Sequence, residues 1–229
     1  MPLQIAIDGP VAAGKGTVAR LLASRLGFLY VDTGAMYRTT ALLAKQQSVD
    51  WNDEAKLVEM LGKHTIALRN PLENEKDGRQ ITVLLDGEDV SWAIRTEEMS
   101  RGSSIVSQFQ HVRKVLVEQQ RNIAKTTDVV MEGRDITFRV LPEAQLKIYL
   151  DATLEVRAKR RHSELLTRGT DTSYEDVLRD IQERDNRDMH RDVDPLHVVE
   201  GAWVLDTSPL TIDEVVDTIE KRVKTLQQN

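Results

Sequence analysis

The chain has 229 residues, of which 40% are hydrophobic and 30% charged, and its formal net charge is −6. This length suits one well-filled core that carries a small insertion or lid, and the negative charge excludes a global positive field that would hold the protein on nucleic acid or an anionic membrane. Cysteine is absent from the sequence, which excludes disulfides, thiolate metal sites and cysteine nucleophiles.

The first residues lack the basic start and the long apolar stretch of a signal peptide, and the first apolar run ends at Asp8. No window of the sequence approaches the roughly 18–20 apolar residues that are needed to cross a bilayer. We therefore expect a cytoplasmic location without membrane association.

The opening of the chain has the pattern of a parallel α/β sheet. A short apolar run at residues 3–8 stops at Gly9 and Pro10, which predicts a buried strand that meets a loop. Residues 17–26 have helical spacing and end before Gly27, residues 28–31 predict a second strand, and residues 34–45 predict a second helix. This order of strand, glycine loop, helix and strand is typical of a parallel sheet flanked by helices.

The middle of the chain departs from this pattern. Residues 65–69 and 80–85 predict two strands of a hairpin, which a charged stretch at residues 73–79 separates. Helical segments follow near residues 96–107 and 112–125. We interpret about residues 62–100 as an insertion carried by a single main domain that spans residues 1–229.

The α/β pattern then resumes and continues to the end of the chain. We expect strands at residues 128–131, 145–150 and 203–205. We expect helices from about residue 153, from about 173 to 191 and from 211 to 226, with a loop at 166–172 between the first two. The predicted fold class is therefore α/β, with a parallel sheet flanked by helices.

The strongest local motif is a G-x-x-x-x-G-K sequence between the first strand and the first helix, the context that a phosphate-binding loop requires. Glycines let successive backbone N–H groups approach phosphate oxygens, and the helix adds the positive end of its dipole. Lys15 can reach the β- and γ-phosphates of ATP, and the Thr17 hydroxyl can hold Mg²⁺. The predicted ATP-binding residues are Gly9, Pro10, Val11, Ala12, Ala13, Gly14, Lys15, Gly16 and Thr17.

The end of this loop is unusual, because Gly16 stands where Ser or Thr usually follows the lysine and Thr17 comes one residue later. This ending resembles nucleoside monophosphate kinases more than GTPases or motor ATPases. The alternative, a glycine-rich turn with a chance lysine, is disfavoured by the strand before it and the helix after it.

Candidate cations for a second, anionic substrate lie past the carboxyl ends of predicted strands, where α/β enzymes place their sites. After the second strand, Thr33 can cap the next helix and Arg38 can reach back over the strand edge. After the strand at 128–131, Arg134 stands beside Asp135 and suits bidentate phosphate binding. The alternative for either arginine is an exposed ion pair that contributes little to stability.

The two helices around the loop at 166–172 are rich in charge. Arg184, Arg187, Asp188 and Arg191 share one helix face by their spacing, although such a face also fits a solvated helix with i,i+4 ion pairs. The preceding helix carries four cations in five residues, which end at Arg161. Two basic helical faces around one loop favour a lid that closes over polyphosphate.

Seven segments of the sequence, in this order, closely resemble bacterial-type cytidylate kinase, a family of P-loop nucleoside monophosphate kinases. The segments are residues 9–17, 32–38 (Asp-Thr-Gly-Ala-Met-Tyr-Arg), 87–91 with 94–95 (Gly-Glu-Asp-Val-Ser and Ile-Arg), 112–113, 133–135, 148–152 and 183–188. The resemblance runs from about residue 3 to 224. It implies a five-stranded parallel core, a nucleotide-binding insertion at about 62–100, a lid at about 155–172 and a monomer.

The resemblance also implies an ATP:(d)CMP phosphotransferase that takes ATP as co-substrate, CMP or dCMP as acceptor and Mg²⁺ as cofactor. The implied CMP-binding residues are Thr33, Arg38, Ser104, Arg113, Arg134, Asp135, Arg184, Asp188 and Arg191. The implied catalytic residues are Lys15, Arg157, Arg161 and Arg191.

Each implied residue matches a family position with a defined role. Ser104, Arg113 and Asp135 match positions that meet cytosine, whose amino group needs an oxygen acceptor and whose N3 and O2 need a donor. Arg184 and Asp188 match the positions that bind the sugar. Arg38, Arg134 and Arg191 match the positions around the acceptor phosphate. Arg157 and Arg161 match lid arginines near the transferring group. Residues 136–139 depart from the small pair that usually follows in the family.

The implied mechanism is direct in-line transfer without a covalent intermediate, and the acceptor oxygen is already anionic, so no strong base is needed. Two alternatives stay open: another small-molecule kinase of this fold, and a P-loop switch or regulatory ATP-binding module. No Asn-Lys-x-Asp guanine motif occurs in the sequence, which disfavours a GTPase. The net charge and the lack of interleaved aromatic residues at 157–161 disfavour nucleic-acid binding.

Overall fold

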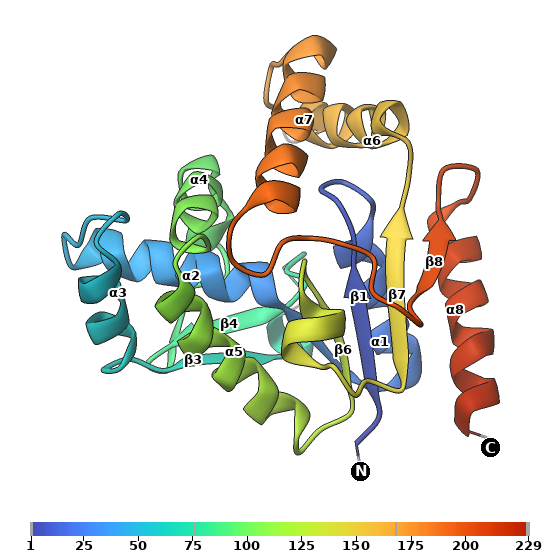
Figure 1. Cartoon of the computed structure of the whole chain (residues 1–229), viewed down its shortest axis with the longest axis horizontal. Coiled ribbons are helices and arrows are strands. Elements are labelled where there is room, and N and C mark those ends of the chain that lie inside the picture. Colours follow the sequence, from blue (N-terminus) through green and yellow to red (C-terminus); the bar gives the residue numbers. More distant parts are fainter. Residues whose placement is uncertain (1, 76, 168, 228–229) are drawn as a thin grey trace.

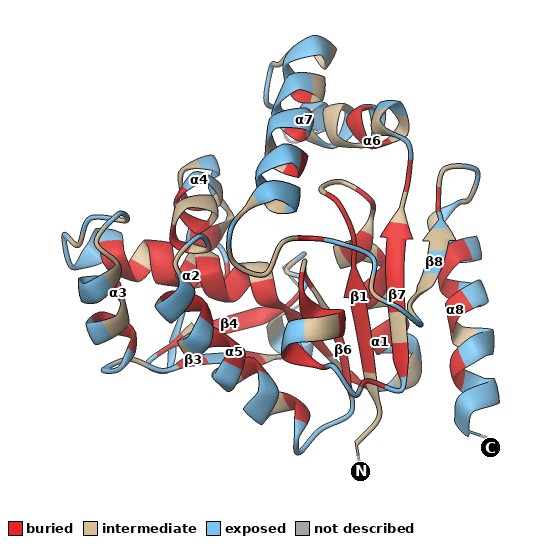
Figure 2. Ribbon diagram, viewed as in Figure 1, coloured by how far each residue is buried: buried red, intermediate tan, exposed pale blue. Residues whose placement is uncertain are grey.

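A five-stranded parallel sheet lies at the centre of the computed structural model, which describes residues 2–75, 77–167 and 169–227 (Figure 1). Every neighbouring pair of strands is parallel, as predicted. The strands, in spatial order, are β2 (Leu29–Asp32), β6 (Val129–Glu132), β1 (Gln4–Asp8), β7 (Leu146–Asp151) and β8 (Trp203–Asp206). The three inner strands are apolar on both faces because helices cover both sides of the sheet (Figure 2).

The helices beside this sheet follow the expected periodicity, with corrections at their ends. Helix α1 (Lys15–Leu26) ends at Gly27, whose left-handed backbone (φ 72°) closes the last turn. Helix α2 (Thr33–Gln46) is capped by Asp32, which accepts a hydrogen bond from the Ala35 N–H at 2.8 Å. The prediction that Thr33 caps this helix is therefore wrong, because the Asp32 carboxylate is the stronger acceptor.

Helices α3 (Glu54–Leu61), α4 (Glu97–Val106) and α5 (Gln110–Ala124) surround α2, and α8 (Ile212–Gln227) packs on α1. The sequence analysis missed α3, an amphipathic helix of only eight residues, whose apolar spacing is too short to stand out. It also missed a π-helical turn at Ile136–Val140 that directly follows Asp135. No helix in the described residues has both the length and the apolar character needed to cross a membrane.

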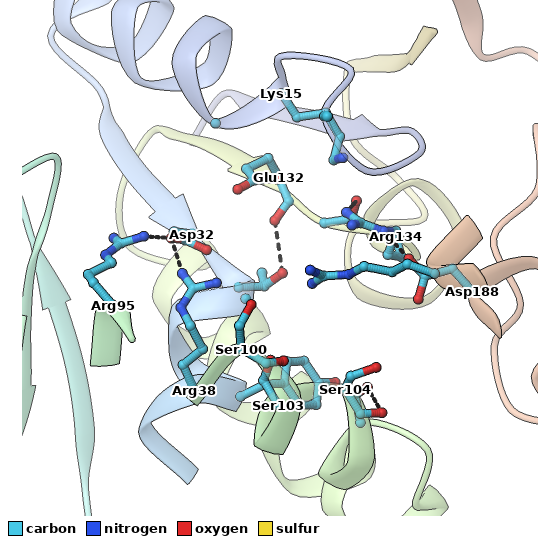
Figure 3. A pocket seen from close by; sticks show the side chains of 18 of the residues that line it. Lys15, Asp32, Arg38, Arg95, Ser100, Ser103, Ser104, Glu132, Arg134 and Asp188 are labelled. Atoms are coloured by element: carbon cyan, nitrogen blue, oxygen red, sulfur yellow. Dashed lines mark hydrogen bonds and ion pairs between the residues drawn. The ribbon is translucent and has the colours of Figure 1, made fainter. Parts of the chain in front are cut away.

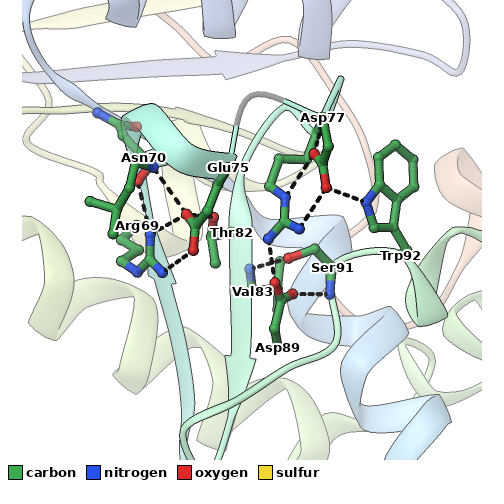
Figure 4. Close-up of polar contacts among 11 residues, drawn as sticks. Arg69, Asn70, Glu75, Asp77, Thr82, Val83, Asp89, Ser91 and Trp92 are labelled. Atoms are coloured by element: carbon green, nitrogen blue, oxygen red, sulfur yellow. Dashed lines mark hydrogen bonds and ion pairs between the residues drawn. The ribbon is translucent and has the colours of Figure 1, made fainter.

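The predicted insertion contains a separate antiparallel sheet of three strands, β3 (Ile66–Arg69), β4 (Thr82–Leu85) and β5 (Glu88–Asp89). The hairpin was predicted, but the two-residue strand β5 was not. Figure 4 shows the polar contacts that fix its connections: the two Nη atoms of Arg69 each donate to the Glu75 carboxylate at 2.6 Å. The side-chain amide of Asn70 joins this sheet to the start of β2. It donates to the carbonyl oxygen of Phe28 at 3.0 Å and accepts from the Tyr30 N–H at 3.3 Å.

The region predicted as a lid, at about 155–172, contains α6 (Leu154–Thr167) and the turn that leads to α7 (Tyr174–His190). The two helices stand together above the carboxyl ends of the strands (Figure 1). A small apolar cluster of its own, Ala158, Val177 and Ile181, joins the two helices. The predicted loop at 166–172 is shorter, because α6 continues to Thr167; Arg168 within it lies outside the described residues. Most of the remaining lid surface is exposed (Figure 2).

Candidate active site

A cavity of about 350 Å³ lies between the phosphate loop, the insertion and the lid. Figure 3 shows that it is walled by polar and charged side chains, with Lys15 facing the serines of α4 across it. Of the predicted residues, the cavity is lined by Ala12, Gly14, Lys15, Gly16, Thr17, Thr33, Arg38, Ser104, Arg113, Arg134, Asp135, Arg161, Arg184, Asp188 and Arg191. Five predicted residues do not line it: Gly9, Pro10, Val11, Ala13 and Arg157.

The phosphate loop curls around its own lysine. Lys15 donates from Nζ to the carbonyl oxygen of Pro10 at 2.7 Å. Burial and then the neighbouring Arg134 lower the pKa of Lys15 to about 7. A buried amine with a lowered pKa and a single carbonyl partner is suited to an incoming anion, which would restore its charged form.

The glycine at position 16 has a steric reason in the structure. A Cβ at Gly16 would lie 3.3 Å from the Tyr30 hydroxyl and 3.6 Å from Oε1 of Glu132. A larger residue at this position would therefore press its Cβ against the tip of the Tyr30 side chain. The next residue, Thr17, lines the cavity with its hydroxyl-bearing side chain.

Asp32, at the end of β2, holds two arginines in the cavity wall. Its Oδ2 accepts from Arg38 at 2.7 Å and from Arg95 at 3.2 Å. Burial raises the pKa of Asp32, but the two guanidinium groups outweigh it and hold the pKa below its usual range. The Nε of Arg38 is buried and has no hydrogen-bond partner among the described residues, while its Nη2 is held by Asp32.

The segment after β6 places Arg134 and Asp135 at the cavity, with their side chains paired to different helices. Arg134 donates from Nε to Asp188 of α7 at 2.6 Å, and Asp135 pairs with Arg113 of α5. The fully buried Asp8 fixes the turn that follows, because its carboxylate accepts from the N–H groups of Ile136 and Thr137 at 2.9 and 2.8 Å. These contacts direct Arg134 toward α7 and Asp135 toward α5 from one short segment.

Helix α7 contributes Arg184 and Asp188 to the cavity, which confirms that these two share a face. Arg191 also lines the cavity, but it is the extended residue just after the helix, so the prediction that it lies on the same helical face is wrong. Arg187 does not join them, since it is exposed and lines a neighbouring hollow. Burial and the adjacent Arg134 lower the pKa of Arg184 to about 10. Within the described part of the chain Arg184 has no ion-pair partner, so its charge is available to an anionic ligand.

The two lid arginines have different surroundings. Arg161 lines the cavity and donates to Glu97 of α4 at 3.2 Å and to Glu164 at 3.0 Å. Arg157 is buried at the base of the lid, where it donates to the carbonyl of Val11 at 3.0 Å and to Asp185. Its observed contacts therefore join the lid to the phosphate loop.

Glu132 is the main site residue that the sequence analysis missed, together with Arg95. It is the last residue of β6, and burial followed by the nearby Asp32 raises its pKa. Its position at the carboxyl end of a central strand, just before Gly133, was a usable signal. The Glu132 carboxylate and the Thr17 hydroxyl both line the cavity, and such hard oxygen ligands fit Mg²⁺. No group of three or more metal-ligating side chains occurs in the described ranges.

Known proteins resemble this chain along its whole length. Residues 5–225 match the sequence profile of a family described as "Cytidylate kinase". A protein of that name from Caldanaerobacter subterraneus subsp. tengcongensis is 46% identical over 224 residues, which is 98% of this chain and 96% of the relative. Another from Bacillus subtilis (strain 168) is 45% identical over 222 residues, 97% of this chain and 96% of the relative.

The fold also has a counterpart among solved structures. A protein of uncharacterised function from Eubacterium ventriosum ATCC 27560 superimposes with a TM-score of 0.55 at 12% sequence identity. The match covers 98% of this chain and 99% of that one. At this identity the likeness concerns the fold alone.

Proposed function

Because the chain belongs to the cytidylate kinase family, we propose that it transfers the γ-phosphoryl group of ATP to CMP or dCMP, giving ADP and CDP or dCDP. The observation that carries this proposal is the composition of one cavity. A phosphate loop stands on one side of it, and the Arg113–Asp135 pair and four further arginines stand on the other: Arg38, Arg134, Arg184 and Arg191.

The donor half of the cavity would hold ATP by its phosphates. The backbone of the loop and the start of α1 would supply N–H donors. The ammonium group of Lys15 would offset the negative charge of the phosphoryl group during its transfer. Thr17 would hold Mg²⁺ at this side of the cavity, where the ion would supply further neutralisation of the phosphate charge. Arg161 of the lid would turn from Glu97 to the phosphates when the lid closes.

The acceptor half would hold CMP by three kinds of contact. Arg38 and Arg134 would face the phosphate, since Asp32 holds the guanidinium of Arg38 and Asp188 holds that of Arg134 at the cavity. Asp188 and Arg184 face the sugar. Asp135, Arg113 and Ser104 face the base, because an oxygen acceptor suits the cytosine amino group and a guanidinium suits its ring nitrogen and carbonyl.

The reaction would then need only orientation and charge. The acceptor phosphate already carries a negative oxygen, so the transfer proceeds in line without a general base. The arginines offset the repulsion between the two substrates, and lid closure keeps water from accepting the phosphoryl group. We expect the insertion at about 62–100 to move with the acceptor, the lid at about 155–172 to move with ATP, and the enzyme to act as a cytoplasmic monomer.

A coupled assay of ADP release tests the proposal directly. CMP, dCMP, UMP, AMP and shikimate are offered as acceptors at equal concentration with ATP and Mg²⁺. CMP and dCMP should give the highest kcat/KM. A preference for AMP or for shikimate, or ATP hydrolysis that no acceptor stimulates, would contradict it.

A further inference from the structure

Arg113 is held on three edges of its guanidinium group. This side chain is 2% exposed. Its Nη2 donates to Oδ2 of Asp135, its Nη1 to the carbonyl of Ser107 at 3.1 Å, and its Nε to Oδ2 of Asp194 at 3.1 Å. The remaining N–H bonds of the two Nη atoms are left for a ligand.

Asp194 lies behind Arg113 and does not line the cavity. It belongs to the turn after α7, where its own carbonyl accepts from Nε of Arg191 at 2.8 Å. The Asp194 side chain is 16% exposed, and its Oδ2 also lies 3.5 Å from Nε of Arg139. Its backbone is left-handed (φ 48°), a conformation that Asp adopts more readily than most residues.

Two carboxylates thus compete for one buried guanidinium. Arg113 meets Asp135 through Nη2 and a single carboxylate oxygen, whereas an arginine and an aspartate without a competitor favour a bidentate pair. Oδ1 of Asp135 accepts no hydrogen bond from the described residues. Asp194 on Nε and the Ser107 carbonyl on Nη1 occupy the positions on either side of Nη2, so Asp135, which lines the cavity, keeps one oxygen without a donor from the described residues.

We propose that Asp194 is a positioning residue for selection of the base: by holding the Nε edge of Arg113, it leaves one oxygen of Asp135 available for the exocyclic amino group of cytosine. This inference rests on the proposed CMP kinase function. Uracil carries a carbonyl in place of that amino group, so it gains nothing from a free carboxylate oxygen. Asp194 should accordingly matter for CMP and much less for UMP.

The test is Asp194→Ala, assayed with CMP and UMP beside the unchanged protein. We expect kcat/KM for CMP to fall about tenfold, the equivalent of one charge-assisted hydrogen bond, while kcat/KM for UMP changes less than about twofold. The KM for ATP should stay constant. The double variant Arg113→Met, Asp194→Ala should have the same ratio of kcat/KM for CMP to kcat/KM for UMP as the single variant Arg113→Met.

Two further variants separate this effect from a disturbed turn. Asp194→Gly removes the carboxylate without strain at the left-handed position, and it should lose the same selectivity. Asp192→Ala removes an exposed carboxylate from the same segment, and it should keep the wild-type ratio. Equal losses for CMP and UMP, or an unchanged ratio in both Asp194 variants, overturns the inference. If the unchanged protein itself shows no preference for CMP, the proposed function fails first.

Discussion

The donor side and the acceptor side of the cavity are built in different ways. The proposed donor side is one continuous stretch, residues 9–17, of which Ala12 and the residues from Gly14 to Thr17 line the cavity. The acceptor side gathers side chains from α2, α4, α5, the end of β6 and α7, which lie far apart in the sequence. Backbone donors recognise any phosphate, whereas a particular nucleobase requires side chains brought from several directions.

This difference predicts that the two sides fail separately when they are altered. A change on the donor side should slow transfer and spare CMP binding. A change on the acceptor side should weaken CMP binding and spare ATP. The experiments below test that separation.

The largest expected effect is that of Lys15→Ala. Loss of the one side-chain cation of the phosphate loop should lower kcat about a thousandfold, because a charge aimed at the transferring group is removed. CMP affinity, measured by calorimetry, should change less than about twofold. Lys63→Ala, which removes an exposed lysine far from the cavity, is the control. Near-normal turnover in Lys15→Ala would refute its role.

Arg38→Met should come next. It removes a fork that Asp32 holds toward the cavity, and each charge-assisted hydrogen bond that it makes with a phosphate contributes about 1.5–3 kcal/mol. The KM for CMP should rise about fiftyfold, with the KM for ATP unchanged. Arg179→Met removes an exposed arginine of α7 and should leave both values as they are. A parallel rise of both constants would break the proposed separation.

Gly16→Ser sharpens the comparison within the donor side. The added Cβ meets the Tyr30 hydroxyl at 3.3 Å, so the loop must shift, and we expect the KM for ATP to rise about tenfold. Tyr30→Phe removes that hydroxyl and should recover part of the loss. Gly62→Ala, where an added Cβ meets its nearest neighbour at 3.5 Å, is the matched control. The absence of any recovery in the double variant would contradict the steric explanation.

The smallest effect is a dependence on pH. The pKa of Lys15 is lowered to about 7, and the charged form binds phosphate, so kcat/KM for ATP should decline as pH rises above this value. Because bound triphosphate favours the charged form, kcat should decline only at higher pH. Glu132 raises the pKa of Lys15, so Glu132→Gln should move the decline to lower pH. A pH profile that moves upward in this variant would count against the assignment.

The difference between a continuous stretch and side chains gathered from distant segments also explains which features could be predicted from the sequence. The phosphate loop and the parallel sheet were predicted because each depends on neighbours in the chain: a glycine run, apolar strands and helical spacing. Arg134 and Asp188 were also predicted, since they follow recognisable segments.

Side-chain contacts between residues that are distant in the sequence were not predicted. Arg95 meets Asp32 over a separation of 63 residues, and Arg113 meets Asp194 over 81. Nothing in the local pattern of either residue states which partner the fold provides. The local pattern also gave Thr33 as the helix cap, although Asp32 beside it is the stronger acceptor.

The surroundings of the phosphate loop limit how it could be exchanged between proteins. A Cβ at Gly9 would lie 2.0 Å from the carbonyl oxygen of Leu150 in β7, and one at Gly16 would press on Tyr30 in β2. The loop is therefore fitted to two strands that are distant in the sequence. A loop with a hydroxyl residue after its lysine would bring a Cβ to 3.3 Å from the Tyr30 hydroxyl. We therefore expect an exchanged loop to fit better when position 30 is changed together with it.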